Sequence, residues 1–264
     1  MRRVRAIAFS VTLGFLVAPS FAVVLGFMDD FSTPGTHGWS TLNGTSNPGT
    51  GGVNGAGDGY LLISSDIVFN FGAYNAEPAY QGDWLAAGIG QVSFYLNDVN
   101  TDEAFFFHFL LSGGPPWREF TTWQCDTGCE PPNGSWAPYT ADLTTGGVGW
   151  TRIRGDATFD EVLQYVDRAH FRHDLPPYTQ YPDGISGDLG IDNIALRPAP
   201  TPGDLDCDGD IDFDDIDPFV LALSDPVAYQ AAYPNCNYLN GDCDNDGDVD
   251  FDDINAFVAL LSGA

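Results

Sequence analysis

A twelve-residue acidic segment that occurs twice near the carboxyl end constrains this chain more than any other feature of its sequence. Residues 204–215 read DLDCDGDIDFDD, and residues 242–253 read DCDNDGDVDFDD. Nine of the twelve aligned positions are identical. Carboxylates at this density repel one another unless a cation neutralises them. A solvated tail would not repeat a glycine at position 6 between alternating acids, so we expect two folded, cation-binding loops.

The spacing of the acids is that of a calcium loop of the EF-hand type. Such loops have carboxylates at positions 1, 3 and 5, glycine at 6, a backbone carbonyl ligand at 7 and an acid at 12. Calcium takes six to eight oxygen ligands. We therefore expect two calcium ions, one in each loop, bound through Asp204, Asp206, Asp208, Asp210 and Asp215 and through Asp242, Asp244, Asp246, Asp248 and Asp253.

The residues after each loop are repeated as well. Apolar side chains recur there with the same spacing, as Ile216, Phe219, Val220 and Leu223 and then as Ile254, Phe257, Val258 and Leu261. The i, i+3, i+4, i+7 pattern predicts a short amphipathic helix after each loop. Prolines interrupt the residues before both loops, so no entering helix is expected. A unit this small needs a core, which we expect the two helices to form with Tyr229, Tyr233 and Tyr238.

A duplicated loop with an exiting helix and no entering helix resembles the dockerin type I module, here over residues 204–264. The resemblance implies a module that folds around two calcium ions and docks onto a cohesin domain. Cellulosomal dockerins have small hydroxyl residues at loop positions 10 and 11 and a basic pair on the next helix. This chain has Phe213-Asp214 and Phe251-Asp252 there, and no basic residue after Arg197. A cohesin-like partner and a cap without any partner stay alternatives, and an exposed apolar patch would favour the partner.

Residues 23–197 are predicted to form a β-sandwich. Short runs rich in β-branched and aromatic residues alternate there with turn-forming Gly, Pro, Asn and Asp. The predicted strands are Tyr60–Phe71, Gln91–Val99, Ala104–Leu111, Trp117–Gln124, Gly149–Arg154 and Ile191–Leu196. One helical turn is expected at Phe159–Val166, and residues 32–58 are expected to form a long loop.

A proline-rich segment separates the two parts. Residues 198–202 read PAPTP, and a polyproline-type segment is stiff and lacks internal hydrogen bonds. We therefore place a linker at residues 198–203 and expect it to hold the sandwich and the module apart without hydrogen bonds between them.

Several short motifs of the predicted sandwich resemble laminin domain IV and galactose-binding-like jelly-roll domains. They are Asp29-Asp30-Phe31, Gly38-Trp39, Gly82-Asp83-Trp84 and the GIDNIAL segment at 190–196. The resemblance implies a fold that is mainly β, a jelly-roll-like β-sandwich followed by a small α-helical calcium module, with a glycan or a protein as ligand. It also implies a structural calcium between the first and last strands at Asp30 and Asp192, for which ordinary turn acids are the alternative.

Aromatic residues offer candidates for a glycan-binding face. Trp117, Trp123 and Trp136 flank a short Cys125–Cys129 segment, and flat aromatic rings stack on sugars. The alternative is that these rings fill the core. No catalytic residue is predicted, because the sequence lacks a nucleophile elbow, a His-Glu metal helix and a phosphate loop. Asp160 and Glu161 form only a sequence pair, and His170 and His173 are expected on opposite faces of a strand.

Charge and the first residues bear on partners and location. The chain has 37 acidic residues against 9 Arg and no Lys, a formal charge of −28, which argues against nucleic acid and anionic membranes as partners. Three arginines, an apolar run and small residues before position 23 predict a bacterial signal peptide at 1–22, with an uncleaved anchor as the alternative. Either way the body is exported, secreted or on the cell surface, and after cleavage no membrane contact is expected. The five cysteines are disulfide candidates, among them a Cys125–Cys129 pair that would close a tight loop.

Together these features predict a secreted calcium-binding protein with a non-catalytic glycan- or protein-binding sandwich, anchored through a dockerin-like module. Polysaccharide breakdown and cell-surface assembly are the expected settings. The alternative is a hydrolase of O-glycosyl bonds that carries a dockerin. A glycosidase needs two carboxylates about 5 to 9 Å apart in a cleft, so the geometry of the acids distinguishes the two hypotheses.

Overall fold

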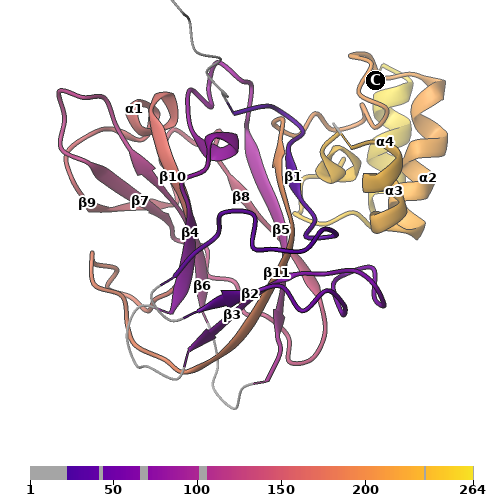
Figure 1. The fold of residues 1–264 in the computed structure, drawn as a ribbon. Helices are drawn as coiled ribbons and strands as arrows, with labels where there is room; N and C mark the ends of the chain where they lie inside the picture. Colours follow the sequence, from indigo (N-terminus) through magenta and orange to yellow (C-terminus); the bar gives the residue numbers. More distant parts are fainter. Residues whose placement is uncertain (1–22, 42–43, 66–70, 101–105, 235, 264) are drawn as a thin grey trace, which may run out of the picture.

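The computed structural model describes residues 23–41, 44–65, 71–100, 106–234 and 236–263. They form a sandwich of two antiparallel sheets and, after it along the chain, a small helical module (Figure 1). The predicted mainly β fold with a helical C-terminal unit is confirmed. The predicted signal peptide at 1–22 lies outside the described residues, and within them no helix is long and apolar enough to cross a membrane.

One sheet, called sheet A here, has the strand order β2-β3-β11-β5-β8, with β1 also paired to β11. Its strands are β1 (Met28–Asp29), β2 (Thr45–Ser46), β3 (Leu61–Ser65), β5 (Gln91–Asp98), β8 (Ala137–Asp142) and β11 (Gly187–Arg197). The pairing of Met28 with Ala195 brings the start of the described chain beside the end of the sandwich. Strand β8 was not predicted, because half of its residues are exposed and Pro138 lies within it.

The other sheet, sheet B, has the order β4-β10-β6-β7-β9. Its strands are β4 (Gly72–Asn75), β6 (Phe107–Gly113), β7 (Thr121–Cys125), β9 (Trp150–Arg154) and β10 (Val166–His173). In the register His170 pairs with both Tyr74 and Leu110, so these three side chains lie on one face. The next residue, Phe171, points the opposite way into the core. His170 and His173 therefore face opposite sides of β10, as predicted.

The core between the sheets is built from alternating apolar residues. Strand β5 alternates buried and half-buried positions, which is the pattern of a sheet with one face inward. Phe94, Phe109 and Phe171 pack against one another at its centre, with ring centroids 4.7 to 6.3 Å apart. The predicted helix is confirmed as α1 (Phe159–Gln164), which begins with a capping box between Thr158 and Glu161.

The helical module contains the two predicted helices and one more. Helix α2 (Ile216–Ser224) and helix α4 (Asp253–Leu261) follow the acidic loops, and α3 (Pro226–Ala232) lies between them. Asp225 caps the start of α3, because its side chain accepts a hydrogen bond from the Ala228 amide, and the helix has proline in its first turn. Phe219 of α2 and Phe257 of α4 stack with centroids 4.1 Å apart, and Tyr229 is fully buried beside them. The predicted helix pairing and tyrosine contacts are confirmed.

The predicted separation of the two parts is wrong. Several hydrogen bonds join the module to the linker and to the end of β11. Asn237 Nδ2 donates to the Pro198 carbonyl at 3.0 Å, the Thr201 amide donates to Asn240 Oδ1 at 2.8 Å, and Arg197 Nη1 donates to the Pro234 carbonyl. A proline-rich segment lacks internal hydrogen bonds, but its carbonyls stay free to accept from a neighbour. Asn237 and Asn240 supply those contacts, so the module packs on the sandwich.

Candidate functional site

The first acidic loop brings three of its predicted ligands together. Carboxylate oxygens of Asp204, Asp206 and Asp215 lie within 4.8 Å of one another. Asp215 is buried and its oxygens accept hydrogen bonds from the amides of Leu205 and Asp206 at 2.6 and 3.1 Å. Asp204 Oδ1 is buried, and the described residues provide no hydrogen-bond donor for it. A buried carboxylate oxygen without a donor among other carboxylates is a fit for a hard cation.

The second loop also brings its carboxylates together, in two groups. Asp242, Asp244 and Asp246 form one group of oxygens within 4.8 Å, and Asp248, Asp250 and Asp253 form another. The carboxylate of Asp242 accepts from the Asp246 and Gly247 amides at 3.1 Å each. These bonds hold the position 1 carboxylate over the sharp turn at position 6, where Gly247 has a φ of 106° that glycine adopts without strain.

The carboxylates crowd one another in both loops. Burial and then neighbouring carboxylates raise the pKa of Asp204, and burial raises the pKa of Asp206. The pKa values of Asp210 and Asp248 are raised chiefly by the adjacent Asp208 and Asp246. Asp208, at position 5, and Asp210, at position 7, lie outside the three-residue group of the first loop. For Asp210 this is expected, because position 7 of such loops contributes its backbone carbonyl instead of its side chain. The residues therefore fit two calcium ions, which stay a prediction.

The helices that follow the loops expose matched apolar side chains. Phe213 and Phe251, at loop position 10, are 78% and 76% exposed, and Val220 and Val258 are each 55% exposed. Ile216 and Ile254 also match each other, at 37% and 38%. The predicted apolar stripe is therefore split, since Phe219 and Phe257 enter the core and Leu223 and Leu261 pack against it. The isoleucines and valines of the stripe face outward. We call these six exposed residues the apolar face of the module; such a patch is typical of an interaction surface.

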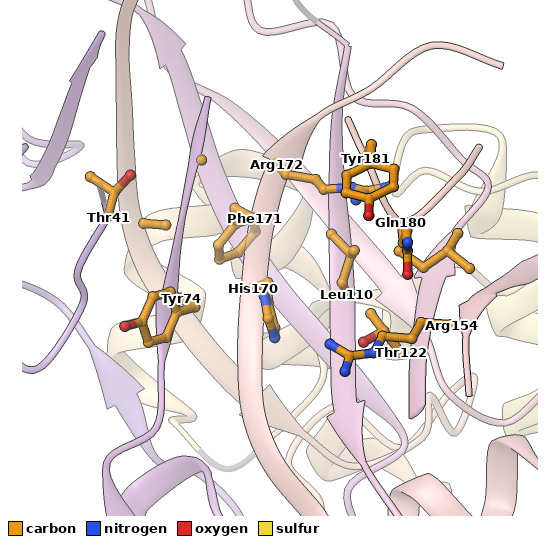
Figure 2. Close-up of a pocket in the computed structure, with 13 residues that line it drawn as sticks. Thr41, Tyr74, Leu110, Thr122, Arg154, His170, Phe171, Arg172, Gln180 and Tyr181 are labelled. Carbon is orange, nitrogen blue, oxygen red and sulfur yellow. The ribbon is translucent and has the colours of Figure 1, made fainter. Parts of the chain in front are cut away.

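A groove crosses the outer face of sheet B. It has a volume of about 600 Å³, and its lining comes from all five strands and from the loop after β10. Figure 2 shows Tyr74 on one side, His170 and Leu110 in the middle, and Arg154 with Gln180 and Tyr181 on the other. Four inter-strand steps of about 4.8 Å give the groove a length of about 19 Å. The groove suits an extended ligand rather than a compact one.

Polar groups on the groove floor are differently engaged. Arg172 is buried; its Nε donates to Gln124 Oε1 at 2.7 Å and its Nη2 pairs with Asp174. The Nε2 atom of His170 is buried and has no hydrogen-bond partner among the described residues. Burial, and then the charges of Arg168 and Arg172, lower the pKa of His170 to about 3. The ring is therefore neutral near pH 7.

The predicted aromatic platform does not assemble. Trp117 is 70% exposed beside Tyr165, whereas Trp123 packs on Phe159 of α1. Trp136 packs on Tyr60 and donates its indole hydrogen to the Gly51 carbonyl. The three rings thus have separate partners, and the groove is lined by Tyr74 and Tyr181 instead. A signal for the groove was present in the alternation of His170 with Arg172, which places two polar side chains on one face of β10.

Other residues singled out in the sequence have structural roles. Glu161 caps α1 and pairs with Arg118 at 3.3 Å, so Asp160 and Glu161 do not form a pair in a cleft. The candidate disulfide between Cys125 and Cys129 does not form, because both are buried free thiols. Cys243 is also a free thiol and is half-buried. The disulfide joins Cys207 to Cys236.

The two acids assigned to a sandwich calcium differ in environment. Asp30 Oδ1 accepts from the amide and hydroxyl of Ser32, as a turn acid does. Asp192 is fully buried and accepts from the Val53 and Asn193 amides at 2.8 Å each. Burial raises the pKa of Asp192 to about 7 despite these bonds. Asp192 thus anchors the loop around Val53, and a calcium ion there stays a prediction.

Asp29, from the same motif, is the centre of a hydrogen-bond network. Its Oδ2 accepts from the Trp39 indole at 2.9 Å and from the Tyr80 hydroxyl at 2.8 Å, and its Oδ1 lies 3.1 Å from His37 Nδ1. His37 Nε2 in turn lies 3.0 Å from Thr33 Oγ1. Both carboxylate oxygens of Asp29 therefore hold the loop before β2 against the core.

Comparison with known proteins gives only distant similarities. No protein-family model and no curated protein matches the chain, so the dockerin resemblance stays a prediction. Among solved structures, an exo-beta-agarase aligns with 68% of this chain and 25% of its own length, at 16% identity and a TM-score of 0.47. The family 11 carbohydrate-binding module of Clostridium thermocellum covers 65% of this chain and 95% of its own (19% identity, TM-score 0.44). A family 22 xylan-binding domain of Paenibacillus barcinonensis covers 66% of this chain and 97% of its own length, at 10% identity and a TM-score of 0.41. TM-scores below 0.5 carry no inference about ligand or activity.

Proposed function

We propose that this chain is an exported calcium-binding protein whose β-sandwich binds glycans without catalysis and whose C-terminal module anchors it to a partner protein. One observation carries the calcium part: ligand-type carboxylate oxygens converge within 4.8 Å in both copies of the repeated loop. Calcium neutralises these groups, so its binding energy contributes to the folding of the module.

Removal of calcium tests this part. All six tryptophans lie between residues 39 and 150, so tryptophan fluorescence reports only on the sandwich, whereas α2, α3 and α4 dominate the helical circular dichroism. We expect EDTA to abolish most of the helical signal, leave tryptophan emission nearly unchanged, and be reversed by calcium. A helical signal that EDTA does not alter would contradict calcium-dependent folding.

The groove supports glycan binding. It is open, about 19 Å long by strand spacing, and combines the exposed ring of Tyr74 with hydrogen-bonding groups such as Gln180 and Arg154. Sugars present hydroxyl edges and apolar faces, so a polar groove with aromatic rings complements them.

Two aromatic variants test the groove. Titration calorimetry of the calcium-bound chain against a panel of oligosaccharides is expected to find a ligand, and Tyr74→Ala is expected to weaken it about tenfold. Trp117→Ala is the matched control, since Trp117 is exposed but lies outside the groove. Equal affinity of wild type and Tyr74→Ala for the ligand would contradict binding in the groove.

The apolar face of the module supports anchoring to a partner of the cohesin-like kind. The two loops expose their position 10 phenylalanines almost equally, at 78% and 76%. Exposed apolar rings of this kind are typical of an interaction surface rather than of a cap without a partner. The double variant Phe213→Ser, Phe251→Ser is expected to fold normally and to lose binding to a partner that the wild type retains.

The hydrolase alternative finds less support. Among the described residues that line the groove there is no Asp or Glu, whereas the glycosidase mechanism needs two carboxylates about 5 to 9 Å apart. A second pocket of about 540 Å³ contains Asp29 and Glu77, but both oxygens of Asp29 are engaged by Trp39, Tyr80 and His37. An assay for new reducing ends with each bound glycan separates binding from hydrolysis.

A further inference from the structure

The positive charges of the described residues gather on one sheet. Arginines supply all of them apart from histidine, and five lie on sheet B or beside it: Arg118, Arg152, Arg154, Arg168 and Arg172. The sixth, Arg197, is buried against the module. In a chain with a formal charge of −28, this concentration of arginine makes sheet B the surface most favourable to an anion.

Arg154 is the arginine of the groove with no acidic partner among the described residues. Arg172 pairs with Asp174, and Arg168, next to the groove, pairs with Asp167 at 2.9 Å. Arg154 is exposed, and its guanidinium lies 5.7 Å from the ring centre of Phe120. A stacked guanidinium keeps its N–H donors free at the ring edge, so Arg154 presents them to a ligand in a fixed position.

The rest of the groove does not offset this charge. Its described lining has no carboxylate, although 37 of the 264 residues are acidic. Figure 2 shows the Arg154 guanidinium beside Thr122, across the groove from Tyr74. The buried Nε2 of His170 lies between them without a partner among the described residues. A ligand that spans the groove thus meets a tyrosine ring at one side and a guanidinium without an acidic partner at the other.

The acidic module lies on the other side of the sandwich. Its residues Gln230, Tyr238 and Leu239 line a pocket together with Tyr95 of β5 and Tyr139 of β8, which belong to sheet A. Sheets in a sandwich are about 10 Å apart, and the Debye length at physiological ionic strength is about 8 Å. The acidic loops are therefore largely screened from an anion bound at the outer face of sheet B.

From these observations we infer that the groove selects anionic glycans, whose sugars bear carboxylate or sulfate groups, over neutral glycans of the same backbone. The inference rests on the proposed glycan binding at this groove. Arg154 binds the anionic group, because a guanidinium donates two parallel N–H bonds to a carboxylate or sulfate. Tyr74 stacks on a sugar ring nearer the β4 edge.

Paired ligands that differ only in charge test the inference. The probes are tetragalacturonate and its methyl ester for the carboxylate, and a κ-carrageenan tetrasaccharide and its desulfated form for the sulfate. Short oligomers avoid the gels that calcium forms with the polymers. In calorimetry with the full calcium-bound chain at 0.15 M salt, we expect at least one anionic probe to bind tenfold or more tightly than its neutral counterpart. The better pair identifies the group.

Two arginine variants locate the selectivity. Arg154→Gln is expected to reduce the preference of the groove for the anionic probe over the neutral probe to about twofold. Arg152→Gln is the control, because Arg152 is also exposed on β9 but stacks on Trp123 outside the groove lining. The preference of Arg152→Gln for the anionic probe over the neutral probe is expected to equal that of the wild type.

Three results would overturn the inference. Equal binding of the anionic and neutral probes, with both weakened by Tyr74→Ala, would overturn the anion preference and leave glycan binding in place. An anion preference that Arg154→Gln retains would overturn the role of the groove in selecting charge. Absence of binding to every probe and to a panel of neutral oligosaccharides would overturn glycan binding itself, and the inference with it.

Discussion

His170 provides a quantitative test of the groove floor through its effect on acid stability. Its Nε2 is buried without a partner among the described residues, and burial together with Arg168 and Arg172 lowers its pKa to about 3. In the unfolded chain a histidine titrates near its ordinary pKa of about 6.5. As the pH falls below that value, the histidine binds a proton in the unfolded state but not in the folded state. Stability is therefore fully present above pH 6.5 and is lost towards pH 3.

The magnitude follows from the interval between the two pKa values. Each pH unit between them costs about 1.4 kcal/mol, so at pH 4.5 the neutral ring costs up to about 2.7 kcal/mol. Replacement by glutamine removes the titrating group and keeps a hydrogen-bonding side chain. His170→Gln is therefore expected to be more stable than the wild type at pH 4.5 by about 2 to 3 kcal/mol, and close to it at pH 7.5.

Urea unfolding followed by tryptophan fluorescence measures the difference. The signal comes only from the sandwich, so effects of acid on the calcium loops do not enter. Burial also lowers the pKa of His108 and His173, and both residues are present in each protein, so their contributions cancel in the comparison. Parallel loss of stability in the two proteins between pH 7.5 and 4.5 would refute the assignment of a buried, neutral His170.

Three further predictions concern the module and the network at Asp29. Asn240→Ala removes the acceptor of the Thr201 amide and the donor to the Asp204 carbonyl. Since each buried group left unpaired costs about 1 to 3 kcal/mol, the module should unfold at a lower urea concentration when followed by helical circular dichroism. The unfolding of the sandwich, followed by tryptophan fluorescence, should shift little. Asp253→Asn is expected to leave only one tight calcium site in calorimetry, since its carboxylate belongs to an oxygen group of the second loop; two unchanged sites would refute its role. Asp29→Ala leaves the buried donors of Trp39 and Tyr80 unpaired and should destabilise the sandwich by about 2 to 6 kcal/mol, whereas a loss below about 0.5 kcal/mol would contradict the network.

Local patterns made part of this structure predictable. The repeat of acids and glycine depends on loop geometry that spans twelve residues, so the sequence contains the whole motif. Helices α1, α2 and α4 have their periodicity and their first-turn acids within nine residues or fewer. The long run of β5 carries the alternation of a sheet with one face inward, which is also a local signal.

Other features depend on residues that are far apart in sequence. The groove combines Tyr74, His170 and Arg154 from strands that are neighbours only through the order of sheet B, and sequence alone does not give that order. The apolar stripe of α2 could not be divided into core and surface, because which side faces α4 depends on the packing of Phe219 against Phe257. The contact between linker and module likewise needs Asn237 and Asn240, about 40 residues away.

Calcium titration of the calcium-free full chain tests the central claim most directly. Calorimetry gives the number of ions, and circular dichroism followed in the same titration gives the helix content. Binding of two ions with a gain of helix and steady tryptophan fluorescence is the predicted result. No binding, or binding that leaves the helix content unchanged, would contradict a module that folds around calcium and would leave the sandwich as the source of function.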